Sequence, residues 1–395
     1  MTAEQGAYLD NAATTMPRPE VIACMNDVLA DAWGNPSSPH AVGQRAKQVL
    51  EESRTTLAEL LGVEPDEVYF TSGSTESNNL AVRGICLARR DHPGKIVTSS
   101  LEHASVTRSV RGMRRDDDWP CAYVEAPGGA LDLDQLRGLL LDGPTALITM
   151  MRVQNEVGWI FPIEEVARIR DELAPDAALH CDATQAFGKL PCEPRAWGID
   201  LLTAGAHKIG GPRGIGLLYV KRSTKMFTTA FGGGQERGLR SGTEPVFLAA
   251  GFACAARLAV RDREQSFAHV SALRARAIER LRAAIPAVVV HAPEGGSPYI
   301  LSISVPGLPN AHSVRYLSDR GVYVSRASAC EENHTTVAPG TWREKHPLSL
   351  QAAGIPLREG KETLRISFCP QNTESDIDRL VATLAACVRE QVKER

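Results

Sequence analysis

Short apolar and β-branched runs alternate with longer segments of helical spacing between residues 68 and 221. The runs are short enough to be buried strands, and the segments between them repeat apolar residues every three or four positions, as helices do. Strands that alternate with helices are typical of an α/β domain with a largely parallel sheet. The seven predicted strands are 68–71, 95–99, 121–125, 146–151, 178–181, 201–204 and 216–220.

Long helices are predicted on both sides of this region. The first covers 40–61 and ends at Gly62, and an Ala- and Leu-rich helix covers 246–260. A second, smaller α+β unit follows, with helices at 266–285 and 374–392 and strands at 288–291, 300–305, 322–324 and 363–367. The stretch 331–360 contains prolines and little periodicity, so we expect it to be functional or mobile.

The domain organisation follows from these elements. We expect a large α/β domain over residues 16–261 and a small C-terminal α+β domain over 262–395, with residues 1–15 joining the small domain. A chain of 395 residues is long enough for two such units.

Composition and charge exclude several classes of protein. Hydrophobic residues make up 43% and charged residues 23%, which is ordinary for a globular protein and argues against disorder. The 44 Lys and Arg against 47 Asp and Glu give a net charge of −3, so nucleic acid is a poor partner. Residues 1–6 lack the features of a signal peptide, and no apolar run is long enough to span a membrane. We therefore expect a cytoplasmic protein without a membrane segment.

The nine cysteines are scattered and include no C-x-x-C pair. This spacing argues against a disulfide scaffold and against a metal site, so most of the cysteines are expected to be reduced core residues.

Polar residues follow the predicted strands, where ligands bind in doubly wound sheets. Residues 71–76 form a small polar turn before a helix, and the free N–H groups of such a turn suit a phosphate. An ordinary helix cap with no ligand is equally compatible with this turn. The side chains that follow the later strands are His103, Asn155, Asp182, Gln185 and Lys208.

Taken singly, these residues have structural interpretations as a buried histidine, a helix cap and a surface lysine. Together they suit pyridoxal phosphate, which needs a lysine amine for its aldehyde, a carboxylate for its ring nitrogen and an anion site for its phosphate. Lys208, Asp182 and the turn at Ser74 and Thr75 supply these three groups. An imidazole such as His103 suits stacking on the ring and proton transfer, and Gln185 and Asn155 suit its phenolic oxygen.

Cys330 is a candidate nucleophile. It lies among small and polar residues in 325–331, just after a predicted strand and at the head of the irregular stretch. A packing cysteine more often has apolar neighbours, although the sequence context leaves both interpretations open.

Several runs resemble one enzyme family in collinear order over nearly the whole chain. They are 8–15, 34–38, 70–78, 155–158, 182–190, 206–208 and 231–243. These runs are similar to those of the cysteine desulfurases, which are pyridoxal-phosphate enzymes of the class V aminotransferase family. The resemblance implies a fold type I transferase with a mainly parallel seven-stranded sheet.

The resemblance also implies roles for individual residues. Lys208 matches the family's Schiff-base lysine, Asp182 the partner of the ring nitrogen, Gln185 the partner of the phenolic oxygen and His103 the stacked acid–base imidazole. The matches to phosphate contacts are Ser74, Thr75, His207 and, from a neighbouring subunit, Thr243.

Thr243 therefore implies a homodimer. Arg365 matches the arginine that binds the substrate carboxylate, and Asn155 and Asn35 match residues near the substrate. Cys330 matches the cysteine that takes up sulfur from L-cysteine and passes it to an acceptor protein, for which a flexible segment is suited.

The sequence departs from the family pattern at two places. The family usually has a serine three positions before the lysine, where this chain has Gly205, so one phosphate contact is lost. After Cys330 the family continues with Ser or Gly, whereas this chain has Glu331 and Glu332 and then His334. Neighbouring carboxylates disfavour a thiolate, and a histidine favours it.

The leading hypothesis is a cysteine desulfurase that forms L-alanine and a persulfide on Cys330, with iron–sulfur cluster assembly or thiolation as outlets. The unusual Glu331–Glu332 pair keeps a selenocysteine lyase or another β-elimination lyase as an alternative. Gly205 keeps open a second alternative, a catalytically weak scaffold that binds a sulfur-accepting protein.

Overall fold

The computed structural model describes residues 6–291, 293–326 and 348–393. The large domain contains all seven predicted strands, each within one residue of its predicted bounds. They are β2 (Val68–Thr71), β3 (Lys95–Ser99), β4 (Cys121–Val124), β5 (Thr145–Met151), β6 (Ala178–Asp182), β7 (Leu201–Gly205) and β8 (Gly216–Val220). The sheet order is β2-β8-β7-β6-β5-β3-β4, and β8 alone in this sheet runs antiparallel to its neighbours. The predicted mainly parallel sheet is confirmed.

The sheet separates two buried layers because side chains alternate between its faces. Ile96 and Leu147 belong to one apolar cluster, whereas Val97 and Ile148, the next residues along the same strands, belong to the other. Helices α3 (Ser74–Ala88) and α4 (Ala104–Asp117) cover the first face. The helices that pack on the opposite face are α2 (Ala41–Leu61), α5 (Leu133–Leu141), α6 (Ile163–Leu173) and α7 (Val246–Arg261).

Helix α2 has the predicted ends. His40 caps its start by accepting a hydrogen bond from the Gly43 N–H, at 3.3 Å. Gly62 ends it at φ 65°, a left-handed conformation that favours glycine, and its N–H bonds to the Ala58 and Glu59 carbonyls. Helix α1 (Pro19–Asp31), which we did not predict, packs on α7.

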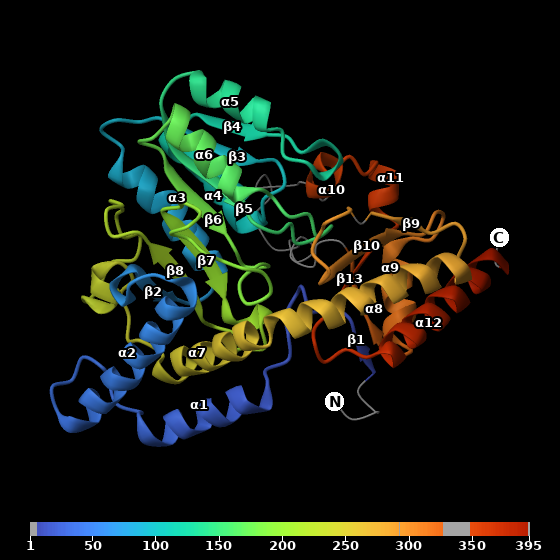
Figure 1. Ribbon diagram of the computed structural model, residues 1–395, viewed down its shortest axis with the longest axis horizontal. Helices are drawn as coiled ribbons and strands as arrows, with labels where there is room; N and C mark the ends of the chain where they lie inside the picture. Colours follow the sequence, from blue (N-terminus) through green and yellow to red (C-terminus); the bar gives the residue numbers. More distant parts are fainter. Residues whose placement is uncertain (1–5, 292, 327–347, 394–395) are drawn as a thin grey trace.

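The small domain has its own antiparallel sheet, in the order β12-β13-β10-β9. Its strands are β9 (Val289–Val290), β10 (Ile300–Ser304), β12 (Ser325–Arg326) and β13 (Thr363–Ser367). The helices beside it are α8 (Arg263–Ala284), α9 (Asn310–Ser318) and α12 (Glu374–Lys393) (Figure 1). Its apolar cluster is separate from those of the large domain. The predicted division at residue 262 stays a prediction, which the change of cluster between α7 and α8 supports.

The N-terminal segment runs beside the small domain. Strand β1 (Ala7–Tyr8) pairs in parallel with β11 (Val322–Tyr323), and Ala12 N donates to Ser367 Oγ at 2.8 Å. Figure 1 shows β1 next to α12, with the chain running from there toward α1 under the large domain. Residues 9–15 therefore lie between the two sheets.

The interpretation of 331–360 as irregular is wrong for its described part. Residues 348–360 contain the short helices α10 (Leu348–Ala352) and α11 (Leu357–Gly360). Leu350 and Ile355 are buried against the core of the large domain, and helices this short are too brief to show a hydrophobic period. No helix within the described ranges combines the length and apolarity needed to cross a membrane.

Candidate active site

A cavity of about 470 Å³ lies where the carboxyl ends of the parallel strands meet the N-terminal segment and the small domain. Its size is that of a cofactor site. Polar groups from both domains face it. The sequence-predicted residues that line it are Ser74, Thr75, His103, Asn155, Asp182, Gln185, His207, Lys208 and Arg365.

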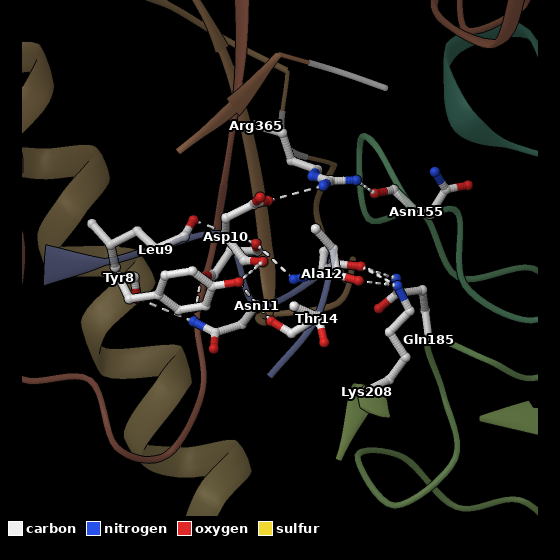
Figure 2. Close-up of polar contacts among 12 residues, drawn as sticks. Tyr8, Leu9, Asp10, Asn11, Ala12, Thr14, Asn155, Gln185, Lys208 and Arg365 are labelled. Atoms are coloured by element: carbon white, nitrogen blue, oxygen red, sulfur yellow. Dashed lines mark hydrogen bonds and ion pairs between the residues drawn. The ribbon is translucent and has the colours of Figure 1, made fainter. Parts of the chain in front are cut away.

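Lys208 follows β7 in the short helix η4 (Ala206–Lys208). Its Nζ donates to the main-chain carbonyls of Ala12 and Ala13 at 2.6 and 2.7 Å. Figure 2 shows Lys208 and Gln185 both directed at the Ala12 carbonyl. The N-terminal segment thus holds the amine at the wall of the cavity.

Asp182 is the last residue of β6, and its carboxylate is fixed on two sides. Asn78 Nδ2 donates to Oδ2 at 2.8 Å, and the Thr184 N–H donates to Oδ1 at 2.9 Å. Asn78 lies in α3, so one side of the carboxylate is anchored to a helix and the other to its own turn. The carboxylate is a preorganised acceptor for a cationic N–H group.

Gln185 is oriented by a buried lysine. Lys189 Nζ donates to its Oε1 at 3.1 Å, while Gln185 Nε2 donates to the Ala12 carbonyl at 2.9 Å. The amide therefore presents its NH₂ group on the Ala12 side. Burial, reinforced by the neighbouring Lys208, lowers the pKa of Lys189 to about 7.

His103 and His207 are neutral bases in this environment. Burial lowers the pKa of His103, although Asp182 acts in the opposite direction, and burial together with Lys208 lowers the pKa of His207 to about 3. His103 Nδ1 accepts the Ser105 N–H at 3.2 Å, so the proton of the neutral ring lies on Nε2. His207 Nδ1 lies 3.2 Å from Thr14 Oγ1.

The start of α3 is suited to an anion. The first N–H groups of a helix have no intrahelical acceptors, and Gly73 provides no side-chain cap for those of α3. Ser74 Oγ is buried beside them and has no hydrogen-bond partner among the described residues. A phosphate oxygen would satisfy these donors, because helix N-termini attract negative charge.

Arg365 lies in β13 at the boundary between the domains. Its guanidinium donates to Asp10 Oδ1 and to the Asn155 carbonyl, each at 3.0 Å (Figure 2). The side chain is 4% exposed, and its Nε has no hydrogen-bond partner in the described part of the chain. A planar donor in this position suits a carboxylate.

The sequence profile described as aminotransferase class-V matches residues 7–380, which is almost the whole chain. The chain belongs to the class-V aminotransferase family. Pyridoxal phosphate is the usual cofactor of this family, and its needs are those that the cavity meets: an amine, a carboxylate and an anion site.

Relatives in this family are similar over nearly their full lengths. An IscS-like cysteine desulfurase of Mycobacterium tuberculosis is 35% identical over 97% of this chain and 96% of its own. A protein named cysteine desulfurase IscS from Methanosarcina thermophila is 34% identical over 98% of this chain and 93% of its own.

Solved structures agree with this membership in fold. A NifS-like protein superposes with a TM-score of 0.89 at 30% identity, over 98% of this chain and 100% of the other. A structure of SspA in complex with cysteine gives a TM-score of 0.78 at 29% identity, over 93% of this chain and 100% of the other.

Two predicted site residues of this class-V aminotransferase lie outside this cavity. Asn35 and Thr243 are exposed and do not line the cavity of the single chain, and Asn35 Oδ1 accepts the Ser37 N–H instead. Cys330 lies outside the described residues.

Sequence reasoning missed several groups that build this class-V aminotransferase site. Asn78 and Lys189 lie inside the runs that carry the family resemblance. Each donates a hydrogen bond to a predicted site residue, Asn78 to Asp182 and Lys189 to Gln185. Asp10 belongs to another such run. The Ala12 carbonyl carries no side-chain signal, so only the fold reveals its contact with Lys208.

Proposed function

We propose that this protein is a pyridoxal-phosphate-dependent cysteine desulfurase. The observation that carries the proposal is that Lys208 and Asp182 line one cavity together with the anion site at the start of α3. The near-full-length similarity to cysteine desulfurases supports the same reaction.

Each residue has a separate task in holding the cofactor. The Asp182 carboxylate would accept a hydrogen bond from the ring N–H, and the Gln185 NH₂ group would donate to the phenolic oxygen. The residues that would bind the phosphate are Ser74, Thr75 and His207. When bound, pyridoxal phosphate supplies an aldehyde that captures amines and a ring that withdraws electrons from the substrate Cα. Asn155 lines the same cavity and would contact the ring or the substrate.

The chain's own residues would bind the substrate and move its protons. Arg365 would bind the carboxylate of L-cysteine, because a guanidinium matches a carboxylate with two parallel hydrogen bonds. The Lys208 amine would take the Cα proton and return it. His103 would exchange protons with the substrate thiol at Nε2, the atom left free by the cap of α4.

Sulfur would leave the substrate by attack of the Cys330 thiolate. A bond forms between the Cys330 sulfur and the substrate sulfur, the substrate carbon–sulfur bond breaks, and the three-carbon remainder is protonated to L-alanine. The persulfide then passes its outer sulfur to an acceptor protein. In a homodimer Thr243 would contact the phosphate of the other subunit, and Asn35 would lie near the substrate.

The experiment is incubation of the purified protein with L-cysteine, followed by assay of alanine and by intact-mass measurement. Alanine and one added sulfur atom on Cys330 are expected. Cys330→Ser should lose both, whereas the control Cys121→Ser, at a half-buried cysteine outside the cavity, should keep both. Equal alanine from Cys330→Ser would exclude the persulfide step. Faster turnover of selenocysteine by that variant would favour the lyase.

A further inference from the structure

We propose that Ser74 supplies the phosphate hydroxyl that the family usually places at position 205. One hydroxyl serves the phosphate, and in this chain it comes from position 74. This inference rests on the proposed binding of pyridoxal phosphate. It concerns a positioning residue of this chain, and it explains the departure at Gly205 as an exchange of the hydroxyl between two elements.

Glycine at 205 is not required by the backbone. Gly205 has φ −133° and ψ 132°, an extended conformation that any residue adopts. It is the last residue of β7, a position at which a side chain is ordinarily accepted. The space around its Cα offers a reason for glycine instead.

That space is occupied by the Ser74 hydroxyl. A Cβ built on Gly205 would lie 2.5 Å from Ser74 Oγ, too close for two unbonded atoms, whereas the Ser74 Cβ would be 3.8 Å away at ordinary contact distance. The conflict is thus with the Ser74 oxygen alone. Ser74 Oγ stands where the side chain of a serine at 205 would begin.

Within the described residues, the Ser74 hydroxyl also makes no hydrogen bond that would explain its position. It is buried, with no hydrogen-bond partner among the described residues, and it belongs to the first helical residue of α3. Buried polar atoms normally have partners, since an unmade hydrogen bond is costly. The same cavity is lined by Thr75, His207 and Lys208, so a phosphate at the start of α3 gives this hydroxyl its acceptor.

The exchange predicts how affinity for pyridoxal phosphate responds to four variants. Ser74→Ala should weaken binding about 10- to 100-fold, the loss of one hydrogen bond to a charged group. Ser74→Ala/Gly205→Ser should recover most of that affinity, because the serine at position 205 then supplies the hydroxyl from the end of β7. Ser74→Ala/Gly205→Ala fills the same space without a hydroxyl and should stay weak. Gly205→Ser alone should bind less tightly than the wild type, because two hydroxyls compete for one place.

The measurement is titration of each apoprotein with pyridoxal phosphate, followed by its visible absorption, with pyridoxal as a matched probe that lacks the phosphate. Melting curves of the apoproteins check that every variant is folded. The Ser74→Ala loss should appear with pyridoxal phosphate and be absent with pyridoxal.

Two results would overturn the exchange. One is an equal loss of affinity with both probes, and the other is a Ser74→Ala/Gly205→Ser variant that binds no more tightly than Ser74→Ala/Gly205→Ala. A wild-type protein that binds neither probe would instead overturn the proposed function, and the exchange with it.

Discussion

Glu102 is a buried carboxyl group with an unusual protonation state. Its Oε1 accepts Ser99 Oγ at 2.6 Å and the Met151 N–H at 2.9 Å, while Oε2 has no hydrogen-bond partner within the described ranges. Burial raises the pKa of Glu102 to about 8, against the opposing effect of these two hydrogen bonds. The neutral acid is therefore the main form at pH 7, directly before His103 in the chain.

This protonation gives a prediction for stability against pH. Because the folded pKa exceeds the unfolded value of about 4.3, the native state binds the extra proton, and stability falls as pH rises from there through about 8. Glu102→Gln keeps a neutral group of the same shape and lacks this loss. The difference in urea midpoint between the variant and the wild type should therefore increase in favour of the variant as the pH rises from 5 to 8. A constant difference between the two proteins would show that Glu102 is ionised throughout.

Arg365 gives a second prediction at the residue scale. Arg365→Lys keeps the charge opposite Asp10 but loses the planar pair of donors, so we expect KM for L-cysteine to rise about 10- to 100-fold. The visible absorption of the bound cofactor should be unchanged. Steady-state kinetics checks this, and a fall in kcat at constant KM would mean that Arg365 organises the site without binding the carboxylate.

At the scale of elements, the segment before α7 is held to α2 by a buried ion pair and to β2 by a hydrogen bond. Arg54 in α2 donates from both Nη atoms to Glu236, each at 2.8 Å, and the Phe70 N–H donates to the same carboxylate. Glu236 lies in the short helix η5 (Gln235–Gly238) at φ 47°, a left-handed conformation that is uncommon for glutamate. The three hydrogen bonds hold this turn in place.

Removing one member of the pair should be strongly destabilising. Glu236→Ala leaves the Arg54 charge buried without its main partner, and we expect a loss of about 3–5 kcal/mol in the free energy of unfolding. Glu51→Ala is the matched control, since Glu51 is a half-exposed partner of the same arginine and should cost about 1 kcal/mol or less. Chemical denaturation of both variants measures the contrast. Equal losses in the free energy of unfolding for the two variants would mean that the buried Glu236 contact stabilises the fold no more than the half-exposed Glu51 contact does.

The sequence predicted the strands of the large domain well because they are short, apolar and regularly spaced. Asp182 and Lys208 were found by the same logic, since a polar residue at the end of a buried strand stands out. The short helices at 348–360 were missed because neither is long enough to show a period. The contact of Lys208 with Ala12 spans 196 residues and ends on a carbonyl, so no local pattern encodes it.

At the scale of the whole molecule, the proposed homodimer places Thr243 in the site of the other subunit. Thr243 is exposed and outside the cavity of its own chain, and Phe231, in the same 231–243 run, is 88% exposed. Covering a phenylalanine side chain this exposed with another surface is favourable, because it removes apolar area from water. These observations support the proposal that the segment is covered by a second copy.

A mixing experiment tests which subunit uses Thr243. Lys208→Ala removes the amine, and Thr243→Ala should lower the affinity for the cofactor about tenfold. If the threonine acts across the interface, a hybrid dimer of the two variants contains one site with both residues intact and one with neither. Differently tagged subunits, purified as hybrids, should regain tight cofactor binding in half of the sites. No regain over the parent variants would assign Thr243 to its own chain.

The anchoring of Lys208 by residues 12 and 13 has a consequence for biosynthesis. The strand that positions those carbonyls pairs with residues 322 and 323, and the next contacts are with Ser367. During synthesis, Lys208 therefore leaves the ribosome long before residues 322, 323 and 367, which hold the N-terminal segment in place. In chains stopped short of β13, the Ala12 and Ala13 carbonyls should not yet be held against Lys208, and this wall of the cavity forms only when β13 is added.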